Sequence, residues 1–104
     1  MKECTIKREG AELTVKIQCE IDHHTAKFIR EAVDTALFEK PLTVLELDFS
    51  RVSFMDSSGI GLILGRASKA EELGARVEIV GLSGALRKLV CMSGVERISN
   101  VTVK

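Results

Sequence analysis

The spacing of apolar residues changes repeatedly along this chain, and this alternation restricts the fold more than any other feature. Over residues 13–19 every second residue is apolar, which is typical of a strand with one buried face. Residues 26–37 instead place apolar side chains at helical spacing. Apolar runs at residues 42–49 and 77–80 are each followed by another helical pattern. Strands that alternate with helices predict an α/β domain with a mixed, mostly parallel sheet.

The N-terminal part predicts a hairpin followed by a helix. Residues 4–8 and 13–19 flank a Glu-Gly-Ala turn, so they are expected to pair. Asp22 and Thr25 are both candidate caps of the helix that follows. Pro41 disfavours helical geometry in the residue before it, so this helix should end at residue 40 or earlier.

The middle of the chain predicts a buried strand and a second helix. Residues 42–49 are dense in apolar side chains, as expected of a strand covered on both faces. Gly74 would close the helix that follows in a left-handed conformation. If Leu64 is buried in the apolar stripe of this helix, its replacement by Ala should cost about 2 to 5 kcal/mol. That stripe comprises Ile60, Ile63, Leu64, Ala67, Ala70 and Leu73.

The last third predicts a strand at residues 77–80, a third helix and a final extended piece at 98–103. Ser83 can cap that helix, and Gly94 would stop it. The whole sheet should therefore have four to five strands, with an N-terminal hairpin and packed helices. There is room for one domain only, spanning residues 1–104.

Composition excludes several classes of function. Fifteen basic residues balance fifteen acidic ones and only four residues are aromatic, so nucleic-acid binding is not expected. No apolar run approaches the roughly 20 residues of a membrane span, and the start Met1-Lys2-Glu3-Cys4 lacks the apolar stretch of a signal peptide, so a cytoplasmic protein is expected. The three cysteines lack disulfide or zinc spacing and are interpreted as small buried apolar residues.

Residues 54–61 read Phe-Met-Asp-Ser-Ser-Gly-Ile-Gly and lie where a polar loop meets an apolar helix. Asp and Ser are good N-caps because their oxygens accept amide hydrogens that the first turn leaves unpaired. The same amides and the helix dipole would stabilise a phosphoryl group on Ser57. A plain N-cap is the simpler interpretation of any isolated Asp-Ser-Ser-Gly, so the surrounding residues decide.

No enzyme, metal or cofactor site is indicated. Gly59, Gly61 and Gly65 lack the Gly-x-Gly-x-x-Gly spacing of a dinucleotide site. His23 and His24 are adjacent, so they do not share the helical face that two zinc ligands need. The serines are also not framed as Gly-x-Ser-x-Gly. The small residues are better explained as leaving the start of the helix free of bulky side chains, so that a partner can approach its backbone and the Ser57 hydroxyl.

Three segments together resemble the anti-sigma-factor antagonists, which are STAS-domain proteins. Residues 20–26 read Glu-Ile-Asp-His-His-Thr-Ala, residues 54–66 extend the motif above, and residues 92–94 read Met-Ser-Gly. The two longer blocks are most similar to the sporulation sigma-F branch. The resemblance implies a STAS fold and a non-enzymatic protein that binds an anti-sigma factor and thereby frees the sigma factor.

The resemblance also implies a switch and a docking surface. The anti-sigma factor is a serine kinase that phosphorylates Ser57 and then releases the protein, and a serine phosphatase restores the binding form. The free protein is expected to be monomeric. The implied partner-binding residues are Asp22, Asp56, Ser57, Ser58, Gly59, Ile60 and Gly61, with Leu89 as a weaker candidate.

Two other functions stay open, and two features depart from the family pattern. A STAS module could sense a small ligand or nucleotide through the glycines at the helix start, or it could be a scaffold subunit of a signalling assembly. Cys19 stands where the family usually has glycine. The residues after Gly94 leave little room for the family's final helix, so the sheet is expected to have an uncovered face or edge.

Overall fold

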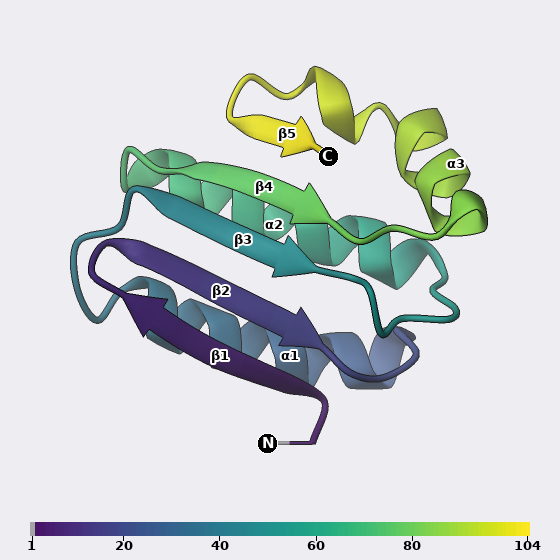
Figure 1. The fold of residues 1–104 in the computed structure, drawn as a ribbon, viewed down its shortest axis with the longest axis horizontal. Helices are drawn as coiled ribbons and strands as arrows, with labels where there is room; N and C mark the ends of the chain where they lie inside the picture. The colour runs from purple at the N-terminus through teal and green to yellow at the C-terminus, as the bar shows by residue number, and fades with distance from the viewer. Residues whose placement is uncertain (1) are drawn as a thin grey trace.

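The computed structural model describes residues 2–104 and contains a five-stranded sheet with three α-helices (Figure 1). The elements in chain order are β1 (Cys4–Glu9), β2 (Glu12–Ile17), α1 (His23–Leu37), β3 (Val44–Asp48), α2 (Ser57–Glu72), β4 (Arg76–Val80), α3 (Gly84–Ser93), the 3-10 helix η1 (Val95–Arg97) and β5 (Val101–Val103). This order confirms the predicted α/β fold, including the N-terminal hairpin and the last extended piece.

The strands lie side by side in sequence order, β1-β2-β3-β4-β5. Only β1 and β2 are antiparallel, because a tight turn at Gly10 joins them, and every later pair is parallel. The crossover helices α1 and α2 both lie behind the sheet in Figure 1, so they cover the same face. Parallel strands need such crossovers, and right-handed crossovers in one direction place successive helices on one side.

The core lies between this sheet face and the two helices. In register across the sheet, Val15 pairs with Leu47 and Leu47 with Ile79, and all three are buried. From the helix side the core receives Ile29 and Ile63, neither of which has any exposed surface. The alternating pattern of β2 thus becomes one apolar layer of the sheet.

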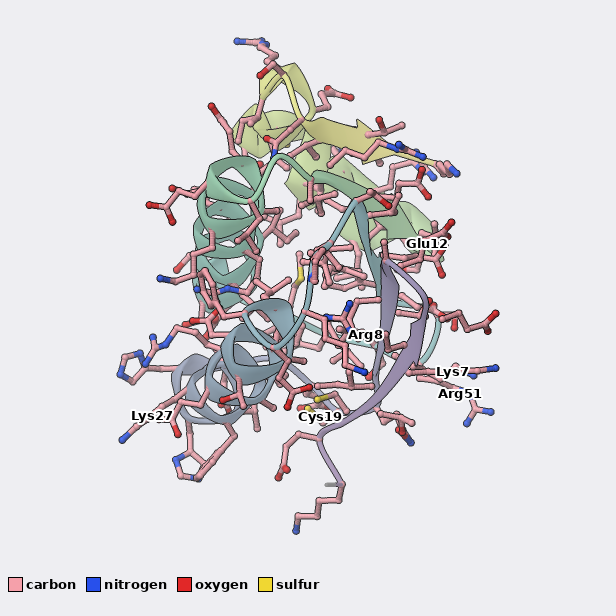
Figure 2. All side chains as sticks on the ribbon, turned by 90° about the vertical axis from the view of Figure 1, so that its left-hand side faces the viewer. Lys7, Arg8, Glu12, Cys19, Lys27 and Arg51 are labelled. Atoms are coloured by element: carbon pink, nitrogen blue, oxygen red, sulfur yellow. The ribbon has the colours of Figure 1, made fainter. Side chains whose placement is uncertain are left out.

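The opposite face of the sheet is polar, and the prediction that strand 42–49 is covered on both faces was wrong. One row across this face consists of Lys7, Thr14, Glu46, Glu78 and Thr102. Figure 2 shows Lys7 projecting on the side away from α1 and α2. β3 reads Val-Leu-Glu-Leu-Asp, so its charged residues alternate with the buried leucines and face outward. The expected uncovered face is therefore present.

The buried stripe of α2 also differs from the prediction at one position. Leu64 is 44% exposed, whereas Leu62 and Ile63 are 4% and 0% exposed. Each residue advances about 100° around a helix, so Leu64 lies past the buried arc that Ile63 occupies. The cost predicted for replacing a buried Leu64 therefore does not apply.

The predicted helix ends are confirmed. Asp22 caps α1, Ser83 caps α3, and Gly74 and Gly94 have positive φ angles of 74° and 82° just after α2 and α3. Only Cys4 among the cysteines is fully buried, while Cys19 and Cys91 are half-buried, so that prediction was right for one residue. Burial raises the pKa of Cys4 and of Cys19, which keeps both as neutral thiols near pH 7.

Candidate functional site: the joined entrances of α1 and α2

A short parallel bridge brings together the two longer sequence blocks. Ile21, just before α1, pairs with Met55, just before α2. The backbone amide of Ile21 donates to the Phe54 carbonyl at 3.0 Å, and the amide of Asp56 donates to the Ile21 carbonyl at 3.1 Å. These bonds fix the two N-cap residues, Asp22 and Asp56, beside each other at one end of the molecule.

Asp22 is held rigidly while its side chain stays exposed. Its Oδ1 accepts the backbone amide of Thr25 at 2.8 Å, and its own amide donates to the Thr25 hydroxyl at 3.0 Å, which completes a capping box. The hydrogen bond from the backbone amide of Thr25 is the main reason that the pKa of Asp22 lies below its usual value. Asp22 is therefore a fixed anion at neutral pH, and the cap it forms is lost only as the pH falls through that lowered pKa.

Ser57 is the first residue of α2, and its side chain is exposed. No described residue hydrogen-bonds to its hydroxyl. The cap is made instead by Asp56, whose Oδ1 accepts the Ser58 amide at 2.8 Å. Ser58 itself is half-buried. Of the two serines, Ser57 has the side chain that a modifying enzyme can reach more easily.

The glycines that follow have different surroundings. Gly59 is buried, and a Cβ at this position would come within 2.5 Å of the Met55 sulfur, so its small size serves internal packing. Gly61 is exposed, and a Cβ there would meet no atom within 4 Å. Ile60 between them is half-buried. The bare surface at the entrance of α2 is therefore centred on Gly61.

Not every predicted contact residue belongs to this surface. Gly59 lies beneath it, and Leu89 is half-buried on α3, where it packs against the core. Two apolar side chains near the start of α2 are exposed although the sequence did not predict them as contact residues: Phe54 is 51% exposed and Leu64 is 44% exposed. Leu64 lies one helical turn after Ile60, so it extends the apolar part of the surface along α2.

A cavity of about 300 Å³ adjoins this surface, and it was not predicted from the sequence. It opens between α1 and α2, and it is lined by His23, Ala26, Lys27, Arg30, Ser58, Gly61, Leu62 and Arg66. Arg66 is 3% exposed, the one charged side chain buried among the described residues. The only signal in the sequence is that an arginine interrupts the apolar stripe of α2.

The residues that could have indicated other chemistry are arranged differently. The His24 ring packs edge-on against the Phe28 ring, with centroids 5.0 Å apart. Within residues 2–104 no group of three His, Cys, Asp or Glu side chains could hold a metal ion. No helix in the same part of the chain combines the length and the apolar character needed to cross a membrane.

Comparison with known proteins agrees with this architecture. The STAS domain family model matches residues 4–103. The anti-sigma F factor antagonist of Lysinibacillus sphaericus is 34% identical over 79% of this chain and 70% of its own. The corresponding protein of Paenibacillus polymyxa is 33% identical over 83% of this chain and 74% of its own.

Solved structures give the same result in three dimensions. The anti-sigma factor antagonist SpoIIAA in its unphosphorylated form superimposes with a TM-score of 0.82 at 30% identity, covering 97% of this chain and 87% of that one. The phosphorylated form of the Bacillus cell fate determinant SpoIIAA gives 0.75 at 30% identity, covering 97% and 90%. The chain therefore belongs to the STAS-domain family, in its branch of anti-sigma factor antagonists.

Proposed function

We propose that this chain is a phosphorylation-switched antagonist of an anti-sigma factor that is also a serine kinase. The unmodified protein binds the anti-sigma factor, which releases the sigma factor, and phosphorylation of Ser57 ends the binding. A serine phosphatase then restores the binding form. The protein would act in the cytoplasm, as a regulator of sporulation transcription and not as an enzyme.

The main observation behind this proposal is that the exposed Ser57 hydroxyl stands at the start of α2, one turn before the bare backbone of Gly61. The Ile21–Met55 bridge joins this segment to the one that carries the fixed carboxylate of Asp22. Two findings support it further. Relatives with similar sequences are anti-sigma F factor antagonists, and the similar SpoIIAA has been solved in a phosphorylated form. The surface therefore combines a modification site with room for a partner to approach.

The position also explains how the chain would tolerate the phosphate. The first turn of a helix has unpaired amides and the positive end of the dipole, and both favour a negative group. The Ser57 side chain is exposed, and its hydroxyl makes no hydrogen bond to a described residue that the phosphate would break. The free protein should therefore keep its fold after modification, and the effect of the phosphate should fall on the complex.

Replacing Ser57 by Ala tests the proposed site. The variant should still bind the anti-sigma factor, because it loses only one hydroxyl, but it should take up no phosphate from the kinase. Mass spectrometry of the products after incubation with kinase and ATP measures this. Ser58→Ala is the matched control and should be phosphorylated normally. Undiminished phosphate in Ser57→Ala, or phosphate found on Ser58, would show that the site is wrong.

Replacing Gly61 by Ala separates binding from folding. An alanine in a helix is favoured over glycine by about 0.5 to 1 kcal/mol, and the new methyl group meets no neighbour, so urea unfolding should show a stability equal to or above that of the original. If Gly61 lies in the docking surface, calorimetry should nevertheless show weaker binding to the anti-sigma factor. Gly65→Ala, which also meets no atom within 4 Å, is the control on the same helix. Equal binding by both variants would remove Gly61 from the surface.

A further inference from the structure

The cavity between α1 and α2 has an unusual excess of positive charge. Lys27, Arg30 and Arg66 line it, and within residues 2–104 the one carboxylate paired with any of them is Asp34, whose Oδ1 lies 2.8 Å from the Nε of Arg66. Three positive charges against one negative charge leave a net charge of +2. Lys27 projects from the helix side of the molecule in Figure 2.

Arg66 is the deepest of these cations, and its hydrogen bonding is incomplete. Its side chain is 3% exposed, and its buried Nε and Nη1 atoms have no hydrogen-bond partner among the residues that the structure describes. The contact with Asp34 is therefore a close charge pair without hydrogen-bond geometry. Buried polar groups are nearly always hydrogen-bonded, because a buried donor without an acceptor lowers the stability of the fold. A guanidinium with open donors at the wall of a cavity points to an acceptor that would complete it.

The neighbouring cation increases this need. Burial lowers the pKa of Arg66, the charge of Asp34 opposes that effect, and the charge of Arg30 lowers the pKa further. The guanidinium groups of Arg30 and Arg66 are thus near enough for their charges to repel each other. An anion between them would relieve this repulsion.

We propose that this cavity binds a phosphoryl dianion, either as inorganic phosphate or as the phosphate of a small phosphomonoester. A dianion matches the net charge of +2, whereas a single carboxylate would neutralise half of it. Arginine forks bind phosphate through two parallel hydrogen bonds. His23 and Ser58 lie in the first turns of α1 and α2, so both helix dipoles favour the same charge. At about 300 Å³ the cavity is at the lower end of the range for small-ligand sites.

This site is separate from the proposed phosphorylation at Ser57, whose side chain does not line the cavity. The two are nevertheless neighbours, because Ser58 and Gly61 belong both to the cavity wall and to the proposed docking surface. A bound anion would therefore change the charge that an approaching partner meets beside Ser57.

Titration of the isolated, ¹⁵N-labelled chain with inorganic phosphate tests the proposal, with chloride used to hold the ionic strength constant. We expect saturable NMR shifts at the amides of Ser58 and Gly61 and at the Nε–H of Arg66. Arg30→Gln, at an exposed position, should fold normally and weaken binding at least tenfold. Lys88→Gln on α3 removes the same charge outside the cavity and should leave the affinity unchanged. Arg66→Lys keeps the charge but loses the guanidinium group that can donate two parallel hydrogen bonds to phosphate, so it should also weaken binding.

A second arm of the experiment distinguishes the two sources of phosphate. Phenyl phosphate that binds at least tenfold more tightly than inorganic phosphate assigns the cavity to phosphomonoesters, and equal affinity assigns it to the free ion. Shifts that never saturate, or equal weakening by Arg30→Gln and Lys88→Gln, would overturn the proposal. It would also be overturned if phosphate failed to bind while Arg30→Gln weakened binding to the anti-sigma factor, since the cavity would then accept a carboxylate of that partner. None of these readings depends on whether Ser57 is phosphorylated.

Discussion

Replacing Ile63 by Ala should lower the free energy of unfolding by about 2 to 5 kcal/mol, whereas replacing its neighbour Leu64 should change it by less than about 1 kcal/mol. Ile63 has no exposed surface and lies between α2 and the sheet, so its removal leaves a cavity. Leu64 is 44% exposed and already meets water. Urea denaturation followed by circular dichroism measures both changes under the same conditions.

Each variant is a control for the other, because both remove a side chain of similar size from adjacent positions of the same helix. Equal losses of stability would mean that α2 is rotated from the orientation described above. Leu64→Ala has a second use, since Leu64 extends the apolar surface beside Ile60. A loss of partner binding without loss of stability would place Leu64 in the interface.

Phosphorylation of Ser57 should weaken binding to the anti-sigma factor several hundredfold. The phosphate adds roughly 1.5 to 2 negative charges, and at a close-packed interface it must be desolvated beside a surface shaped for a hydroxyl. Misplaced charge of this kind costs several kcal/mol, and a penalty of roughly 3 to 4 kcal/mol corresponds to several hundredfold in affinity. Surface plasmon resonance of the modified and unmodified chains would measure the ratio of the two dissociation constants.

Two controls show whether the penalty belongs to the interface. The melting temperature of the phosphorylated chain should stay close to that of the unmodified chain, because the start of α2 accommodates negative charge. Ser57→Asp should weaken binding by a smaller factor, since a carboxylate carries less charge than a phosphate. A large fall in melting temperature on phosphorylation would show instead that the modification acts by unfolding the protein.

Much of the fold could be predicted from the sequence because its signals are local. The period of the apolar residues depends on a few neighbouring residues, and it predicted the main helices and strands. The caps Asp22 and Ser83 and the closing glycines are equally local signals, and they were confirmed. The errors arose where two interpretations of one pattern compete. Residues 42–49 were interpreted as one apolar strand covered on both faces, although Glu46 and Asp48 within it indicate an outward face.

The prediction that Leu64 is buried in the apolar stripe of α2 was wrong for a related reason. A period of 3.6 residues allows neighbouring positions to fit one apolar arc almost equally well, and only packing against the sheet decides between Ile63 and Leu64. Sequence patterns therefore fix which helices are amphipathic more firmly than they fix the edge of each buried face.

The candidate site could be predicted only in part. The capping chemistry at Ser57 is visible in the sequence, but its closeness to Asp22 depends on the Ile21–Met55 bridge between distant segments. The resemblance to antagonists implied that Asp22 and Ser57 belong to one docking surface, but nothing in the sequence predicted the bridge itself. The charged cavity was missed altogether, because Arg66 meets Asp34 only after α1 and α2 pack together.

The most direct test of the central claim is the release of a sigma factor from its complex with the anti-sigma factor, followed by size-exclusion chromatography. The unmodified chain should displace the sigma factor and elute with the anti-sigma factor, while the same chain phosphorylated on Ser57 should displace none. If both forms release the sigma factor equally, or if neither does, the chain is not a phosphorylation-switched antagonist of that anti-sigma factor.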